Sequence, residues 1–139
     1  MELADTSAWI WTHRAGGSLR AEFAERVVDG EIGTCDMVRL ELLYGVRNPT
    51  ESSAVRAELR ALPDCPIGKR NWLRAIDVYD SLAQQGGLHQ RSVGHADLLI
   101  AAAAEGAGAT LLHYDEDFDR IAAVTGQPTR WIAPRGSLS

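Results

Sequence analysis

The sequence lacks several features that would place it in a class immediately. No apolar run approaches the roughly 18 residues of a membrane-spanning helix, and Glu2 stands where a secretion signal carries basic residues. Cys35 and Cys65 do not have the spacing of paired metal ligands, so we expect reduced thiols in a cytoplasmic protein without a membrane span. No repeat or low-complexity tract divides the chain. Residues 1–139 are therefore expected to form one domain.

Basic residues are also scarce, and nearly all of them are arginine. The net charge is −5, and of the 14 basic residues only Lys69 is a lysine. This balance argues against a simple basic nucleic-acid-binding protein. It does not exclude nucleic-acid chemistry at a metal site, because bound ions offset acidic side chains there. Arginine suits phosphate recognition, but these residues could equally be ordinary solvated side chains, and both interpretations stay open.

Short apolar segments alternate with helical patterns along the whole chain. The patterns predict strands at residues 2–4, 32–35, 65–67, 109–113 and 129–132. They predict helices at residues 6–12, 19–28, 37–46, 52–62, 69–85, 95–105 and 116–125. Ser18 and Asp36 are expected to cap the helices at residues 19–28 and 37–46, and Asn48-Pro49 is expected to end the second of these helices. Strands that alternate with helices indicate an α/β fold with a mostly parallel sheet flanked by helices.

Four acidic residues lie in or beside apolar runs, where a lone charge is costly to desolvate. They are Asp5 in LADTSAW, Glu41 in VRLELLYG, Asp97 in GHADLLIAAAA and Asp115 in LLHYDEDF. Asp5 and Asp115 follow predicted strands, whose carboxyl ends share one ligand-binding edge of a parallel sheet, and helices can bring the other two there. Like charges about 4 Å apart repel by about 4 kcal/mol at an effective dielectric of 20. A cluster therefore needs a cation, and oxygen ligands suit Mg²⁺ or Mn²⁺, which predicts metal-assisted phosphate chemistry.

Each acid also has an ordinary structural interpretation. Asp5 and Asp115 stand where helix caps are common. Glu41 is close in sequence to Arg39 and Arg47, although neither has the spacing of a pair on one helix face. Asp97 is harder to explain in this way, because it interrupts an almost wholly apolar helix. Together, at one sheet edge, the four acids favour a shared site.

Other metal and histidine motifs do not fit the sequence. Asp115 begins a spacing that imitates a calcium-binding loop, but Arg120 replaces the glycine at the sixth position and Gly126 the glutamate at the twelfth. The histidines form no HExxH motif. His95 and His113, which flank the two late acids, are expected to be packed or solvated side chains.

The blocks DTSAW, LELLYG, DLLIAAAA and DEDF, in this order and spacing, resemble the PIN domain. More narrowly, the chain looks like the VapC-type ribonuclease toxins of bacterial type II toxin–antitoxin systems, and the resemblance covers essentially the whole chain. It implies a three-layer α/β/α sandwich with a mostly parallel central sheet and a small helical insertion near residues 49–67. The catalytic and metal-binding residues that it implies are Asp5, Glu41, Asp97 and Asp115, supported by Asp117 and by the hydroxyl of Thr6 or Ser7.

The resemblance also implies an activity and partners. The activity is an endoribonuclease that uses one or two Mg²⁺ or Mn²⁺ ions and a water nucleophile to leave 5′-phosphate and 3′-hydroxyl ends. The candidates for RNA phosphate contacts are Arg14, Arg39, Arg47, Lys69 and Arg91. The implied partners are the RNA, a VapB-like antitoxin and a second copy in a homodimer, with no membrane and with DNA only through the antitoxin. The alternatives are a metal-dependent phosphatase acting on a small phosphoester, or a non-catalytic PIN-like module that binds RNA or protein.

One departure from the family pattern lies just before the fourth acid. Many family members have a threonine there, where this chain has His113 and Tyr114. The role of a hydroxyl at this place is therefore left open.

Overall fold

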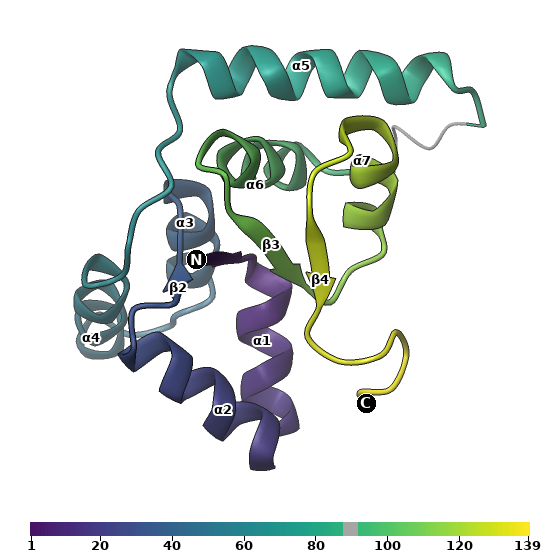
Figure 1. Cartoon of the computed structure of the whole chain (residues 1–139). Helices are drawn as coiled ribbons and strands as arrows, with labels where there is room; N and C mark the ends of the chain where they lie inside the picture. Colours follow the sequence, from purple (N-terminus) through teal and green to yellow (C-terminus); the bar gives the residue numbers. More distant parts are fainter. Residues whose placement is uncertain (88–91) are drawn as a thin grey trace.

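Four parallel strands form the central sheet, in the order β2-β1-β3-β4 (Figure 1). The computed structural model describes residues 1–87 and 92–139. The strands in this part of the chain are β1 (Glu2–Ala4), β2 (Ile32–Gly33), β3 (Thr110–His113) and β4 (Thr129–Trp131). In the register, Leu3 lies opposite Gly33 on one side and Leu111 on the other. Because all four strands run in one direction, their carboxyl ends meet at a single edge.

Helices cover both faces of this sheet, so the predicted three-layer α/β/α sandwich is confirmed. The helices in the described residues are α1 (Thr6–Ala15), α2 (Gly17–Val28), α3 (Asp36–Tyr44), α4 (Pro49–Arg60), α5 (Lys69–Gln84), α6 (His95–Gly106) and α7 (Asp117–Thr125). Leu3 and Leu111 point into the core formed with α6 and its neighbours, whereas Ala4 and Leu112 point into the core with α1 and α2. This alternation follows from the two-residue period of a strand.

Helix α6 is the central helix of one layer, with α5 lying across it and α7 beside it (Figure 1). Every residue from Leu98 to Ala104 is buried. The small alanines let α5 approach closely, and Asn71 of α5 donates a hydrogen bond to the Ala102 carbonyl at 3.2 Å. A Cβ at Gly106 would lie 2.8 Å from Asn71 Nδ2, so a larger residue there would displace the Asn71 side chain.

Three predicted helix boundaries were wrong. Helix α2 begins at Gly17, and Gly16, with φ 62°, is its cap, because a left-handed turn suits glycine; Ser18 lies inside the helix. Asp36 is already the first residue of α3, after Cys35. Asn48 does not end a helix but caps α4, its side chain accepting a hydrogen bond from the Glu51 N–H at 2.8 Å. Pro49 then takes the first helical position, where proline's missing N–H costs nothing.

The strand predicted at residues 65–67 is also wrong. A single bridge joins Thr34 to Asp64, with the Cys65 N–H donating to the Thr34 carbonyl at 2.8 Å. The helical insertion expected near residues 49–67 is present as α4, which packs on α3. No helix in residues 1–87 and 92–139 is long and apolar enough to cross a membrane.

Candidate metal centre

Asp5 is fixed at the carboxyl end of β1 by its own hydrogen bonds. Its Oδ1 accepts from the Ala8 N–H at 3.1 Å and from the Ser7 hydroxyl at 2.7 Å, and its Oδ2 accepts from the Ser7 N–H at 3.2 Å. Asp5 is therefore a helix cap, as its context in the sequence suggested. The residue is only 3% exposed. Because a carboxylate has about four acceptor positions, the cap does not prevent Asp5 from facing a cation.

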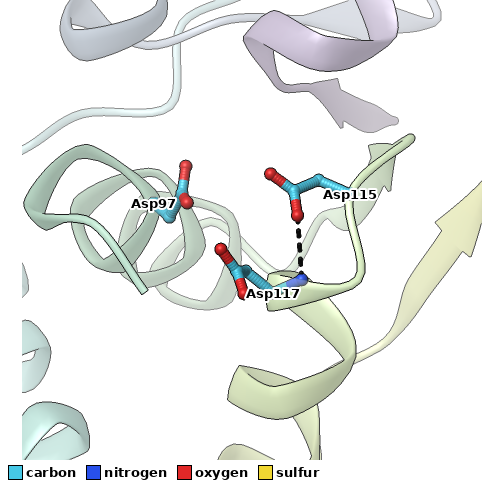
Figure 2. A group of neighbouring side chains, drawn as sticks. All are labelled: Asp97, Asp115 and Asp117. Carbon is cyan, nitrogen blue, oxygen red and sulfur yellow. Dashed lines mark hydrogen bonds between the residues drawn. The ribbon is translucent and has the colours of Figure 1, made fainter. Parts of the chain in front are cut away.

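Three further aspartates converge beside this edge. Asp115 follows β3, Asp97 lies in the first turn of α6, and Asp117 is the first residue of α7. One carboxylate oxygen of each lies within 4.8 Å of the other two, and Figure 2 shows the three side chains facing a common space. Asp115 Oδ1 accepts a hydrogen bond from the Asp117 N–H at 2.9 Å. This bond holds both acids in one turn.

Glu41 belongs to α3 and is bound to α1. Its Oε1 accepts a hydrogen bond from the Thr6 hydroxyl at 2.6 Å. Its charge contributes to the raised pKa of Asp97, so it faces the same region. The closest group of oxygens, however, comprises Asp97, Asp115 and Asp117, and includes neither Glu41 nor Asp5. The structure thus brings Asp117, chosen from the sequence only as a supporting residue, nearer to the centre than Glu41.

The two hydroxyls after Asp5 have separate contacts. Thr6 binds Glu41, whereas Ser7 Oγ donates to Asp5 and accepts a hydrogen bond from the Tyr114 N–H at 2.9 Å. Ser7 therefore joins the end of β1 to the chain that follows β3. Both hydroxyls fix the positions of acidic groups.

Burial and mutual repulsion favour the protonated forms of several of these acids. Burial raises the pKa of Asp97 to about 7, and the neighbouring carboxylates, led by Asp115 and Asp5, add to the effect. Burial also raises the pKa of Asp5 to about 6, against the hydrogen bonds that stabilise its charge. The pKa of Asp117 is raised by burial and by Asp115, while Arg120 opposes the increase.

Arg120 is a part of the site that the sequence analysis did not select. Its guanidinium donates hydrogen bonds to Asp117 and, at 3.2 Å, to Glu116. Arg135 binds the second oxygen of Glu116. The three-residue spacing of Asp117 and Arg120 on a helix is the signal that predicts such a pair.

The sequence-based candidates for RNA contacts are scattered. Arg14 is exposed, with its guanidinium 4.9 Å from the centre of the Trp11 ring. Arg47 is exposed between α3 and α4. Arg39 is engaged in ion pairs with Asp36 and Asp64, at 3.1 and 2.6 Å. This also corrects the idea that Arg39 pairs with Glu41.

Of the two remaining candidates, Lys69 lies away from the acids and Arg91 lies outside the described residues. Lys69 begins α5 at the end that contacts Ala102 and Gly106, whereas Asp97 is at the opposite end of α6. The prediction for Arg91 lies outside the described residues. The structure therefore does not gather the four basic residues that it describes, Arg14, Arg39, Arg47 and Lys69, around the acidic group.

The two histidines beside the late acids behave as the sequence predicted. His95 is exposed at the start of α6. His113 is fully buried and packs against Phe118 and Trp131, with ring centres 5.3 and 4.9 Å apart. Burial lowers the pKa of His113. Burial therefore disfavours the charged form of this histidine.

The acidic group fits a hard divalent cation. Asp97, Asp115 and Asp117 each offer a carboxylate oxygen, and such oxygens are ligands that Mg²⁺ and Mn²⁺ prefer. Oxygens bound to one Mg²⁺ at about 2.1 Å lie about 3–4 Å apart, a little closer than the 4.8 Å limit within which the three aspartates already lie. Burial and the neighbouring carboxylates raise the pKa of Asp97, and a bound cation would offset both effects.

Comparison with known proteins identifies the family of the chain. A family model described as PIN domain matches residues 3–124. Ribonuclease VapC18 of Mycobacterium tuberculosis is 48% identical over 134 residues, which cover 96% of each chain. Ribonuclease VapC51 of the same organism is 40% identical over 109 residues, covering 78% of this chain and 77% of the relative. The chain belongs to the PIN domain family.

Within that family, the chain is similar to proteins that are named VapC ribonucleases. The crystal structure of DNA-bound VapBC from Salmonella typhimurium has a TM-score of 0.74 with 19% identity, covering 96% of this chain and 100% of that chain. This structural likeness shows the fold. The resemblance that the four sequence blocks suggested is therefore confirmed.

Proposed function

We propose that this protein is a metal-dependent endoribonuclease and the toxin of a toxin–antitoxin pair. The observation that carries the proposal is the convergence of Asp97, Asp115 and Asp117 beside the buried Asp5. The similarity to proteins named VapC ribonucleases supports RNA as the substrate. Two non-ribonuclease alternatives, a small-molecule phosphatase and a non-catalytic module, have no comparable support.

In this proposal, one or two Mg²⁺ or Mn²⁺ ions are held by Asp97, Asp115 and Asp5, with Asp117 and Glu41 completing the group directly or through water. A divalent ion at such a site polarises a phosphodiester and lowers the pKa of a water molecule. The residues themselves provide the negative charge, and Ser7 and Thr6 hold two of the acids in place. The expected products carry 5′-phosphate and 3′-hydroxyl ends.

The proposed protein partner is a VapB-like antitoxin. Solved structures of similar fold include VapBC complexes, some of them bound to DNA, which supports a DNA contact made through the antitoxin. The chain also offers a mostly apolar groove of about 610 Å³ between α1, α2, α3 and α4. Trp9, Val27, Leu42 and Val55 line it. We propose that an apolar segment of the antitoxin occupies this groove.

A second copy of the chain is the other proposed partner. Helix α5 carries four apolar side chains, each about half exposed: Trp72 (49%), Leu73 (50%), Ile76 (54%) and Tyr79 (42%). Exposed apolar patches of this kind mark association surfaces, and a twofold dimer buries one patch against itself. Changing Ile76→Glu should convert a dimer to a monomer in light scattering, whereas Ile10→Glu, at an exposed position on α1, should not. An unchanged mass for Ile76→Glu would exclude this surface.

RNA cleavage by the purified chain, free of antitoxin, tests the activity. We expect cutting with Mg²⁺ or Mn²⁺, none with EDTA, and 5′-phosphate on the new ends. Turnover of a small phosphoester with no cutting of RNA would instead favour the phosphatase alternative.

A further inference from the structure

The turn between β3 and α7 is held by side-chain acceptors. Ser7 Oγ accepts the Tyr114 N–H at 2.9 Å, and His113 Nδ1 accepts the Asp115 N–H at 3.1 Å. Asp115 Oδ1 in turn accepts the Asp117 N–H at 2.9 Å. The direction of the Asp115 carboxylate therefore depends on where these acceptors place its backbone.

The imidazole of His113 is held rigidly. Its side chain is fully buried, with Phe118 and Trp131 stacked at tilted angles on it. A ring enclosed in this way presents Nδ1 at one fixed position. Because Nδ1 accepts a hydrogen bond from Asp115, the ring proton lies on Nε2.

With the proton on Nε2, the buried ring has an unpaired hydrogen-bond donor, which lowers stability. An apolar side chain at this position would avoid that loss. Nε2 has no hydrogen-bond partner in the described part of the chain, and its nearest carboxylate oxygen, on Asp119, is 3.9 Å away. That distance is too long for a hydrogen bond. Trp131 Nε1 instead donates to Asp119, at 3.2 and 3.3 Å. A buried donor without a partner costs about 1–3 kcal/mol, so leucine or phenylalanine would serve better if His113 only filled space.

We propose that His113 is a positioning residue: its Nδ1 fixes the backbone of Asp115 so that the carboxylate faces Asp97 and Asp117. The inference rests on the proposed metal-dependent function, because it assigns His113 the task of keeping that site formed. It gives the buried histidine a role beyond filling space in the core.

Two substitutions separate positioning from packing. His113→Leu keeps a buried apolar side chain but removes the acceptor. His113→Thr creates a smaller side chain whose hydroxyl can accept the N–H two residues ahead, as in serine and threonine turns. We expect His113→Leu to weaken Mn²⁺ binding at least tenfold in calorimetry, and His113→Thr to restore it to within about threefold of wild type.

Thermal unfolding of the metal-free variants supplies the control. His113→Leu should melt no lower than His113→Thr, because the threonine leaves a cavity; affinity and stability then follow opposite orders. If Mn²⁺ affinity falls in step with melting temperature, or if His113→Leu binds Mn²⁺ as wild type does, the inference is wrong. Nitrogen NMR of wild type should also show an unprotonated Nδ1 for His113, and a protonated Nδ1 would contradict the hydrogen bond directly.

Mn²⁺ binding by wild type distinguishes failure of the His113 inference from failure of the proposed function. If wild type binds Mn²⁺ and cuts RNA but His113→Leu does both equally well, only the role of His113 fails. If wild type neither binds Mn²⁺ nor cuts RNA, the proposed function fails, and the inference fails with it.

Discussion

Among single residues, Arg120 has the most direct bearing on the acidic group. Its guanidinium is bound to Asp117, whose carboxylate also faces Asp97 and Asp115. The arginine and a divalent ion would therefore compete for the same negative charge. Arg120 offsets part of the repulsion among the acids when no ion is present, and it opposes the ion when one arrives.

Removing this arginine should strengthen metal binding. We predict that Arg120→Ala binds Mn²⁺ about three- to tenfold more tightly than wild type in calorimetric titration, since the lost interaction is of the order of 1 kcal/mol for a partly exposed pair. Arg74→Ala is the matched control, because Arg74 pairs with Glu105 on the α5–α6 side of the molecule. Equal or weaker binding by Arg120→Ala would show that Asp117 takes no part in the metal site.

At the scale of residues, the sequence pointed to the acids but did not show which of them lie nearest to one another. Asp97 was identifiable because it interrupts an apolar helix, and Asp5 and Asp115 because they follow strands. The close approach of Asp117 depends on the hydrogen bond from its N–H to Asp115. The acceptor role of His113 depends equally on the direction of a ring inside the core. Such side-chain directions are set by three-dimensional packing and have no signal in spacing.

At the scale of helices and strands, periodicity predicted the number and order of the elements well. Most errors lie at the ends of helices, where glycine and proline determine at which residue a helix begins or ends. Gly16 ends α1 and precedes α2 in a left-handed conformation, and Pro49 begins α4 instead of ending α3. Residues 65–67 form no strand, and the single bridge beside them joins Thr34 to Asp64. A short apolar segment alone does not reveal whether it has a full partner strand.

The groove between the first four helices gives a prediction at this scale. Ala24 of α2 is exposed and lines the groove. Ala24→Asp should weaken binding of the cognate antitoxin at least tenfold, about 1.4 kcal/mol, because a carboxylate must be desolvated there. Cleavage of RNA by the variant alone should be unchanged.

A matched change on another helix provides the comparison. Ala123→Asp places the same charge on an exposed position of α7, which is not among the residues lining the groove. Antitoxin affinity should be unaffected. If the Ala24 and Ala123 variants bind the antitoxin with equal affinity in a titration, the groove is not the antitoxin-binding site.

For the whole molecule, the raised pKa values of Asp97 (about 7) and Asp5 (about 6) link stability to pH. Between about pH 4 and 7 the folded protein keeps protons on these groups that the unfolded chain has released, so they lower stability as pH rises. His113, whose pKa is lowered by burial, acts in the opposite direction. The difference in stability between wild type and Asp97→Asn, measured against pH, isolates the contribution of the Asp97 carboxylate.

We predict that, in EDTA, Asp97→Asn gains stability over wild type as pH rises from 5 to 8. The expected gain is about 1–2 kcal/mol, less than the pKa difference alone would give at about 1.4 kcal/mol per unit, because the site is partly hydrated. Thermal unfolding at both pH values measures it. Mn²⁺ should stabilise wild type more at pH 8 than at pH 5, since protons compete with the metal. A variant equally stable to wild type at both pH values would mean that Asp97 carries no such penalty.

RNA cleavage by wild type, Asp97→Asn and Asp80→Asn, each with Mn²⁺ and with EDTA, tests the central claim most directly. Asp80 is an exposed acid on α5 and serves as the control for removing one charge. The account predicts cutting by wild type and Asp80→Asn with Mn²⁺ only, and a loss of at least a hundredfold for Asp97→Asn with the fold intact by circular dichroism. Full activity of Asp97→Asn, or equal cutting in EDTA, would contradict it.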